Sequence, residues 1–308
     1  MVPDKIEKFF GYIFFLGLIL FIFLSGTTII SLNVSGSSNS TTLTKVNVTN
    51  TEPSIYSVTL TPSSVDLNAG GTKRVNCTAF VYDLNGGDDI TYANATLYDT
   101  SQGYGKTTDN NYRYRNESCS CIVISTNNAS CSCLFDVWYY ANSGSWECNI
   151  TAYDSYNIGD TAVSNTITVN EVIGIDSSSE IDYGQISVTQ TSDEKTADII
   201  NIGNVPINIT VRGYGGDDRN NPQNSAMVCE QGTIPIGYEK FSITSGQNYD
   251  SMTALSNNTI SMGITLPVRT NDTSYDNDKK QSYWRIYIPS SVAGYCNGTI
   301  EFFAIDAS

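Results

Sequence analysis

Two short acidic stretches contain the side chains with the clearest capacity to bind a cation. They are YDLNGGDD at residues 82–89 and YDSYNIGD at residues 153–160. Carboxylate oxygens are preferred ligands of Ca²⁺, so calcium is the candidate ion at these stretches, although the overall expectation is a protein without a cofactor. The spacing departs from an EF-hand loop, because Gly87 stands where a fifth-position Asp or Asn is needed. The alternative is that both stretches are solvated turns. The candidate ligands are Asp83, Asp88, Asp89, Asp154 and Asp160.

The composition excludes several classes of chemistry and of partner. The 308 residues include no histidine, so triads with a histidine base and His-ligated metals are excluded. Lys and Arg number 16 against 31 Asp and Glu, which gives a net charge of −15. That charge opposes binding to nucleic acid and to anionic lipid. No carboxylate pair stands out for glycoside hydrolysis, so we expect a protein without enzymatic activity.

The N-terminus predicts export. Residues 9–30 are uncharged, and this length is comparable to the ~20 residues that a helix needs to cross a bilayer. Lys5 and Lys8 precede the segment, which favours an N-terminus inside the cell and the bulk of the chain outside. Two interpretations remain: an uncleaved signal anchor that makes the membrane a partner, or a signal peptide cleaved near residues 34–36. Both place residues 45–308 outside the cytoplasm.

Asn-x-Ser/Thr sequons are frequent along the exported part. Glycosylation of such sites requires export and a solvent-exposed position. The alternative is a composition rich in Ser, Thr and Asn that carries no sugar. The sequons are at Asn33, Asn39, Asn47, Asn76, Asn94, Asn116, Asn128, Asn149, Asn208, Asn257, Asn271 and Asn297.

Two cysteines lie in segments with the alternation of a half-buried strand. In TKRVNCTAFVY, Cys77 shares a face with Val75 and Ala79, and in SWECNITAYD, Cys148 shares a face with Trp146. The neighbouring sequon asparagines lie on the opposite, polar faces. Because a glycan cannot enter a core, the two patterns support the same orientation of each strand.

Four further cysteines form two Cys-x-Cys pairs in SCSCIVISTNNASCSC. One antiparallel register centred on Thr126 places Cys119 opposite Cys133 and Cys121 opposite Cys131. A hairpin with two disulfides is therefore expected, since thiols outside the cytoplasm tend to oxidise. Four thiolates at this spacing could instead bind zinc or copper.

The separation of Cys77 and Cys148 resembles the inter-sheet disulfide of immunoglobulin-like (Ig-like) domains. The resemblance implies that these two cysteines are joined. Trp146 departs from it, because a tyrosine usually precedes the second cysteine by two residues. Cys229 and Cys296 then remain, and we expect them to form the fourth disulfide. In such a sandwich the two acidic stretches would lie at one end.

Longer segments also resemble known surface proteins. The stretch from IDYGQISV to VPINITV, with the turn NIGNVP between two expected strands, resembles Ig-like modules of archaeal and bacterial cell-surface proteins. The stretch from SVTLTPSSVDLNAGG to TITV resembles companion modules in archaea with small genomes. A fold does not fix a function. The resemblance therefore implies an Ig-like architecture and a location at the cell surface, and it does not imply a particular activity.

The expected fold class is all-β, with two tandem Ig-like β-sandwiches behind an N-terminal helix and a stalk. The predicted segments are a signal anchor or signal peptide at 1–34, a flexible glycosylated stalk at 35–54, an Ig-like sandwich with disulfides at 55–170, a linker at 171–180 and a second Ig-like sandwich at 181–308. Strands are expected near 55–61, 63–68, 72–82, 90–98, 111–125, 130–140, 145–154 and 161–169, and in IDYGQISV, KTADIINIG, VPINITVRG, SYWRIYIP and GTIEFFAID.

These observations predict a cell-surface or envelope protein with a structural or adhesive role. Its expected partners are other surface proteins or copies of itself. The alternative is a subunit of an extracellular filament that assembles through its N-terminal helix or by strand exchange. A secreted enzyme or a calcium-dependent receptor is a third alternative.

Overall fold

β-Strands make up nearly all the regular structure of the chain. The computed structural model describes residues 39–219, 224–270 and 277–307. Within these ranges the only helices are three short 3₁₀ turns, and none is long and apolar enough to cross a membrane. The predicted anchor or signal peptide at 1–34 lies outside the described residues, as do Asn33 and Asn271. Contacts divide the chain into Met1–Thr49 and Asn50–Ser308.

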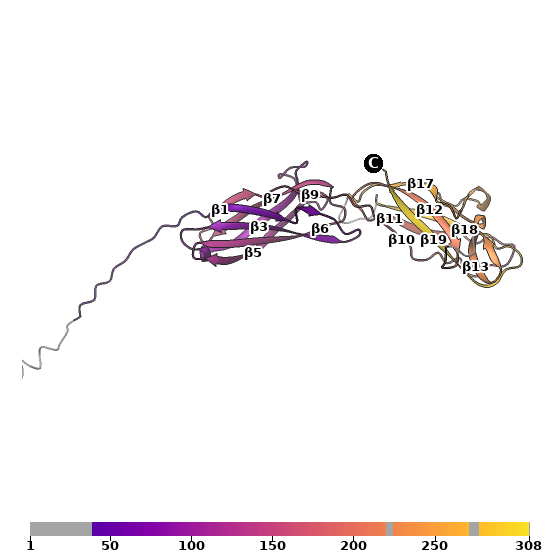
Figure 1. Cartoon of the computed structure of the whole chain (residues 1–308), viewed down its shortest axis with the longest axis horizontal. Helices are drawn as coiled ribbons and strands as arrows, with labels where there is room; N and C mark the ends of the chain where they lie inside the picture. The colour runs from indigo at the N-terminus through magenta and orange to yellow at the C-terminus, as the bar shows by residue number, and fades with distance from the viewer. Residues whose placement is uncertain (1–38, 220–223, 271–276, 308) are drawn as a thin grey trace, which may run out of the picture. The chain divides into compact units, whose positions relative to one another are not determined.

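The first group of strands follows directly on Asn50 (Figure 1). Its hydrogen-bonded order is β1-β3-β6-β5-β4-β7-β9-β2, and β8 pairs with β7. The elements are β1 (Ser54–Thr61), β2 (Ser64–Val65), β3 (Thr72–Tyr82), the 3₁₀ turn η1 (Gly87–Asp89), β4 (Ile90–Asp99), β5 (Arg113–Ser125), β6 (Asn128–Trp138), β7 (Gly144–Asp154), β8 (Gly159–Val163) and β9 (Ile167–Val169).

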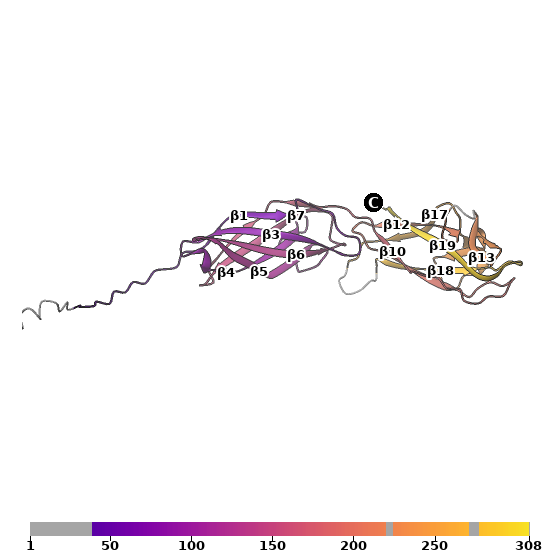
Figure 2. The same ribbon diagram turned by 60° about the horizontal axis from the view of Figure 1, so that its bottom comes forward.

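One strand joins the two layers of this group. The first half of β5, from Arg113 to Cys119, pairs with β4, and the second half, from Ser120 to Ser125, pairs with β6. Figure 2 shows β4, β5 and β6 side by side. The layers enclose one hydrophobic core, an arrangement typical of a β-sandwich.

The core follows from the alternation of apolar residues along the strands. In β3 the side chains of Val75, Cys77, Ala79 and Val81 are buried, and the residues between them are half-buried. Trp146 of β7 is fully buried in the same core. Burial of each large apolar side chain contributes ~1.5–3 kcal/mol, and a shift in register of one residue would turn every one of them to the solvent.

The second group of strands forms two five-stranded sheets, with the orders β10-β11-β18-β15-β16 and β14-β13-β19-β12-β17. Both sheets contribute to a shared core that includes Ile199, Ile209 and Trp284. The elements are β10 (Ile175–Ser177), β11 (Lys195–Asn201), β12 (Ile207–Gly215), β13 (Ser225–Gln231), β14 (Thr233–Pro235), the 3₁₀ turn η2 (Ile236–Tyr238), β15 (Glu239–Ser242), the 3₁₀ turn η3 (Tyr249–Ser251), β16 (Thr253–Ala254), β17 (Ile260–Leu266), β18 (Lys279–Ile286) and β19 (Ala293–Asp306).

Three strand predictions need correction. IDYGQISV at residues 181–188 contains no strand, because Asp182 accepts a hydrogen bond from the backbone N–H of Gly184 and Gly184 has φ of 73°, a turn that interrupts an extended chain. The expected strand at 161–169 is two strands, β8 and β9. The expected linker at 171–180 contains β10, which pairs with β11.

The described cysteines are all joined in disulfides. The hairpin spacing predicted two of the four pairs, the resemblance implied a third, and the fourth was expected because its two cysteines remained. They are Cys77–Cys148, Cys119–Cys133, Cys121–Cys131 and Cys229–Cys296. The first links β3 to β7 across the first core, and the last links neighbouring strands β13 and β19 of one sheet. The four hairpin cysteines are joined in two disulfides, so in this state they offer no thiolate to zinc or copper.

Candidate cation-binding site

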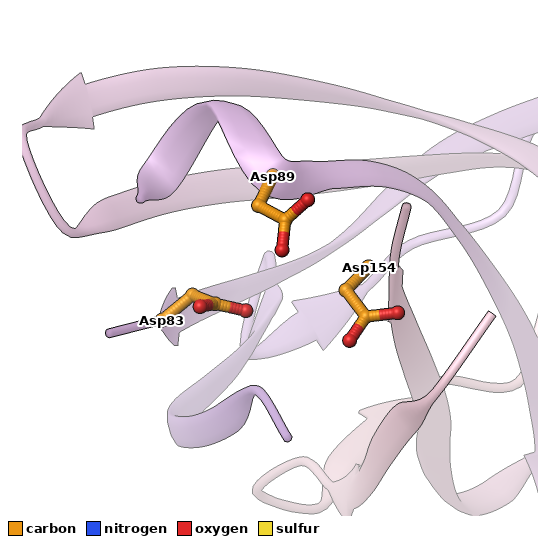
Figure 3. A group of neighbouring side chains, drawn as sticks. All are labelled: Asp83, Asp89 and Asp154. Carbon is orange, nitrogen blue, oxygen red and sulfur yellow. The ribbon is translucent and has the colours of Figure 1, made fainter. Parts of the chain in front are cut away.

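Three aspartates meet at one end of the first group of strands. Asp83 directly follows β3, Asp89 is the last residue of η1 before β4, and Asp154 is the last residue of β7. One carboxylate oxygen from each lies within 4.8 Å of the others. In Figure 3 the three carboxylates surround a common space. The structure thus brings together three of the five aspartates that the sequence analysis selected.

The loop that presents Asp83 and Asp89 is fixed by the β5–β6 turn. Gly87 donates a backbone hydrogen bond to the carbonyl of Thr126, and the side chain of Asn127 donates to the carbonyl of Asp83 at 2.8 Å. A Cβ atom on Gly87 would lie 2.5 Å from the carbonyl oxygen of Asn128. The sequence therefore needs glycine here, because only glycine permits so close an approach of two backbones.

Asp154 is held by a second, tight loop. Its Oδ1 accepts hydrogen bonds from the backbone N–H groups of Tyr156 and Ile158, at 2.9 and 2.8 Å. Its Oδ2 accepts a hydrogen bond from Nδ2 of Asn50, at 2.6 Å. One carboxylate oxygen is therefore fixed by its own loop, and the other faces the segment that precedes β1.

The cluster is deeply buried and incompletely hydrogen-bonded. Asp83 is 0% exposed and Asp154 is 1% exposed. Among the residues that the structure describes, Oδ2 of Asp83, Oδ2 of Asp89 and Oδ1 of Asn50 are buried oxygens without a hydrogen-bond partner. Burial of an unpaired polar oxygen costs ~1–3 kcal/mol, and more when the group is charged. The cluster therefore contains several buried acceptor oxygens that lack a hydrogen-bond donor.

The electrostatics disfavour three negative charges at this site. Burial raises the pKa of the Asp83 carboxyl above its usual value, and the charges of Asp89 and Asp154 raise that pKa further, while the backbone N–H of Asn85 lowers it. Within the part of the chain that the structure describes, none of these three aspartates forms an ion pair. Either a proton or a cation would relieve the repulsion.

The ligand set suits a hard cation. All the candidate donors are oxygens, as Ca²⁺ and Mg²⁺ require. Zinc and copper favour imidazole or thiolate ligands, but the chain has no histidine and its described cysteines are all in disulfides. The residues present therefore fit calcium, and Asp83, Asp89 and Asp154 would hold it.

Two of the predicted ligands lie outside the cluster. Asp88 belongs to η1 but is exposed. Asp160 is the acceptor for the backbone N–H of Ile55 through Oδ2, at 2.7 Å, and for that of Thr161 through Oδ1. Conversely, Asn50 lies in the cluster but was assigned to the stalk, because its neighbours are Ser, Thr and Asn and no local pattern distinguishes it.

The described sequons lie away from the cores. None of the ten sequon asparagines in the described ranges is buried. Asn76, Asn94 and Asn149 are half-buried positions between buried neighbours, as the alternation predicted. Asn208 of β12 is exposed. Attachment of sugar itself stays a prediction.

A second candidate site lies in the later group of strands. It is a groove of about 780 Å³ lined by both polar and apolar residues, and the apolar ones include Ile186, Met227 and Phe302. At its wall, the hydroxyl of Tyr183 donates to Oε1 of Glu239 at 2.8 Å. Burial raises the pKa of Glu239, and the hydrogen bond from Tyr183 partly offsets this rise. The resulting pKa is about 7. The sequence analysis missed this pair, because Tyr183 was assigned to a strand and Glu239 stands alone in its segment.

Comparisons with known proteins assign no family. No protein-family description matches the chain, and no curated protein is significantly similar in sequence. Among solved structures, the chaperone–tip adhesion subunit pre-assembly complex of the Csu pili of Acinetobacter baumannii has a TM-score of 0.37 and 8% identity, covering 79% of this chain and 96% of that chain.

Two further structures have lower TM-scores. A chaperone–tip adhesin complex of CFA/I fimbriae has a TM-score of 0.29 and 10% identity, over 82% of this chain and 84% of that chain. The C-terminal domain of the AgI/II polypeptide BspA of Streptococcus agalactiae has a TM-score of 0.21 and 9% identity. That match covers 82% of this chain and 95% of that chain. These scores are too low to assign a fold family or a function to this chain.

Proposed function

We propose that the chain is a non-enzymatic cell-surface or envelope protein that displays two Ig-like β-sandwiches outside the cell, with a structural or adhesive role. The observation that carries the proposal is the combination of paired cysteines with sequons outside the cores. All eight cysteines are in disulfides, and disulfides persist in oxidising compartments. The ten described sequon asparagines lie outside the cores.

The N-terminal segment supports attachment to a membrane. Its 22 uncharged residues at 9–30 match the length of a spanning helix. The extended residues 39–49 would then connect that helix to the strands as a stalk. A net charge of −15 keeps such a surface soluble and repels anionic lipid.

Labelling of intact cells tests this proposal. A membrane-impermeant amine reagent reaches surface lysines, such as Lys45, Lys73 and Lys106, only when the chain is displayed outside. We expect labelling of these residues on intact cells at the level seen after lysis. Labelling that appears only after lysis contradicts the proposal.

A filament subunit is the second candidate, because one segment has the character of an unpaired strand. Leu43, Val46 and Val48 are exposed, and Asn47 separates the two valines. Residues 39–49 contain no strand, so such a segment could add to the edge of a sheet in a second copy. Negative-stain microscopy tests this: fibres that disappear in a Val46→Ser/Val48→Ser variant support it, and single particles at high concentration contradict it.

A further inference from the structure

We propose that Asp83, Asp89 and Asp154, together with the side-chain oxygen of Asn50, bind one Ca²⁺ ion, and that this ion holds the segment before β1 against the acidic loops. This goes beyond the proposed surface role, which needs no metal. The cluster lies in the first group of strands, apart from the groove that Glu239 and Tyr183 line.

The first argument is the convergence of the carboxylates. Oxygens of Asp83, Asp89 and Asp154 lie within 4.8 Å of one another, which is close enough for all three to bind one ion that takes oxygen ligands at about 2.3–2.6 Å. Asp83 and Asp89 come from the loop between β3 and β4, and Asp154 comes from the end of β7, which is distant in sequence. The fold therefore places them together through its long-range pairing.

The second argument is independent of the acidity of the cluster. Asp83 is 0% exposed, yet its Oδ2 is buried without a hydrogen-bond partner in the described part of the chain. The amide oxygen of Asn50, which is uncharged, is likewise buried and unpaired. Buried acceptors are normally satisfied. A cation between these oxygens would satisfy them all at once.

The third argument concerns the choice of ion. A divalent cation leaves three carboxylates with one net negative charge, whereas a proton leaves two. Mg²⁺ demands near-octahedral geometry and retains several waters, whereas Ca²⁺ accepts six to eight oxygens in irregular arrangements. Carboxylates and an amide from separate loops match the irregular arrangement better. Calcium is therefore the ion that we assign.

The ion would also fix the start of the folded part. Nδ2 of Asn50 donates to Asp154, and the backbone N–H of Thr51 donates to the side chain of Asn85 at 2.7 Å. Ile55 donates to Asp160 at 2.7 Å. Without a cation, repulsion between the carboxylates opposes these contacts. We therefore expect that calcium orders residues 50–55.

Titration calorimetry and thermal unfolding test the proposal on the full-length chain in detergent micelles. Extracellular calcium modules bind with dissociation constants of roughly 10⁻⁴–10⁻³ M, so CaCl₂ is titrated up to about ten times the upper value. We expect one ion per chain, a melting temperature several degrees higher in CaCl₂ than in EDTA, and a smaller rise in MgCl₂. Absence of binding, or an equal rise with Mg²⁺, overturns the assignment.

Matched variants locate the site. Asp83→Asn and Asp89→Asn each remove one ligand charge, and we expect at least a tenfold loss of calcium affinity in both. Asp88→Asn is the control, because Asp88 lies in the same loop but is exposed, and we expect its affinity to stay within twofold. Equal calcium responses in Asp83→Asn, Asp89→Asn and Asp88→Asn would place the ion elsewhere and overturn the proposal.

Hydrogen exchange tests the effect on the segment before β1. Amides of residues 50–55 should exchange at least tenfold more slowly in calcium than in EDTA, and this protection should be lost in Asp83→Asn. Unchanged exchange at these residues, in a chain that binds calcium, would overturn the second half of the proposal while leaving the ion site in place.

Discussion

Asn50 donates a hydrogen bond of 2.6 Å from its side-chain amide to Oδ2 of Asp154, across 104 residues of sequence. This contact joins the first residue of the unit Asn50–Ser308 to the end of β7. The unit Asn50–Ser308 therefore begins within the acidic cluster, five residues before the predicted domain boundary at 55. The stability of that junction should depend on the charge of the cluster.

Removal of one charge should stabilise the cation-free protein. In EDTA, Asp83→Asn replaces a buried carboxyl whose pKa is raised by burial and by its acidic neighbours. Asp83 therefore keeps its proton to a higher pH in the folded state than in the unfolded state. As a result, the free energy of unfolding falls as the pH rises above the ordinary aspartate pKa. We expect a higher melting temperature at pH 7 and a weaker pH dependence than in the unmodified chain.

The exposed Asp88→Asn is the matched control for this measurement, and its melting temperature should stay within a degree or two of the unmodified chain. A melting temperature of Asp83→Asn in EDTA that is lower than that of the unmodified chain contradicts the account of the cluster as a site of uncompensated repulsion.

Glu239 should make the protein less stable as the pH rises toward neutrality. Its carboxyl is buried, and its pKa is raised from 4.5 to about 7. As the pH rises, Glu239 therefore loses its proton in the unfolded state before it does so in the folded state. The free energy of unfolding then falls between about pH 4.5 and pH 7. At 1.36 kcal/mol for each pKa unit, the loss is about 3 kcal/mol. Urea unfolding at several pH values measures it.

Glu239→Gln should remove this part of the pH dependence, because the amide has no proton to release in the range. Exposed Glu230→Gln serves as the control and should leave the dependence unchanged. If Glu239→Gln and Glu230→Gln give identical pH profiles, the burial of Glu239 has no consequence for stability.

The disulfides should differ in their contribution to stability. Cys77–Cys148 closes a loop with a separation of 71 residues, and in the chain-entropy model such a loop is worth about 4 kcal/mol. Cys121–Cys131 lies within a hairpin that Cys119–Cys133 also closes. Denaturant unfolding of the two double alanine variants should therefore show a far larger loss for the first pair. Equal losses would contradict this ranking.

Glycosylation at the strand sequons should be tolerated by the fold. Asn208 is exposed on β12, and Thr265 of the neighbouring strand donates a hydrogen bond to its side-chain oxygen. We expect peptides that contain Asn208 from the native source to carry a glycan mass, and Asn208→Gln to change the melting temperature by less than two degrees. A large destabilisation by Asn208→Gln would mean that the side chain has a packing role.

The sequence was informative where one face of a strand is buried. The range 72–82 was predicted as a strand and is β3, because alternation along half-buried strands is strong. The hairpin cysteines were predicted from register alone, since cross-strand pairs have fixed geometry. The structure adds one detail: the turn is Thr126–Asn127, and a bulge between Val123 and Ser125 absorbs one residue.

The sequence was less informative where structure depends on distant contacts. Strands β13 to β17 were not predicted, because they are short or bulged and their partners lie far away in sequence. Residues 181–188 have a strand-like composition, yet Tyr183 contacts Glu239 in place of a strand neighbour. For the cation site, the acidic stretches of the sequence predicted three of the four proposed ligands. Asn50 was not predicted, because only long-range packing places it against Asp154.

The most direct test of the surface assignment is a non-reducing peptide map of material released from intact cells by protease. We expect peptides from residues 50–308 to be released before lysis and to be linked as Cys77–Cys148, Cys119–Cys133, Cys121–Cys131 and Cys229–Cys296. Peptides that appear only after lysis, or that carry free thiols at these positions, would contradict it.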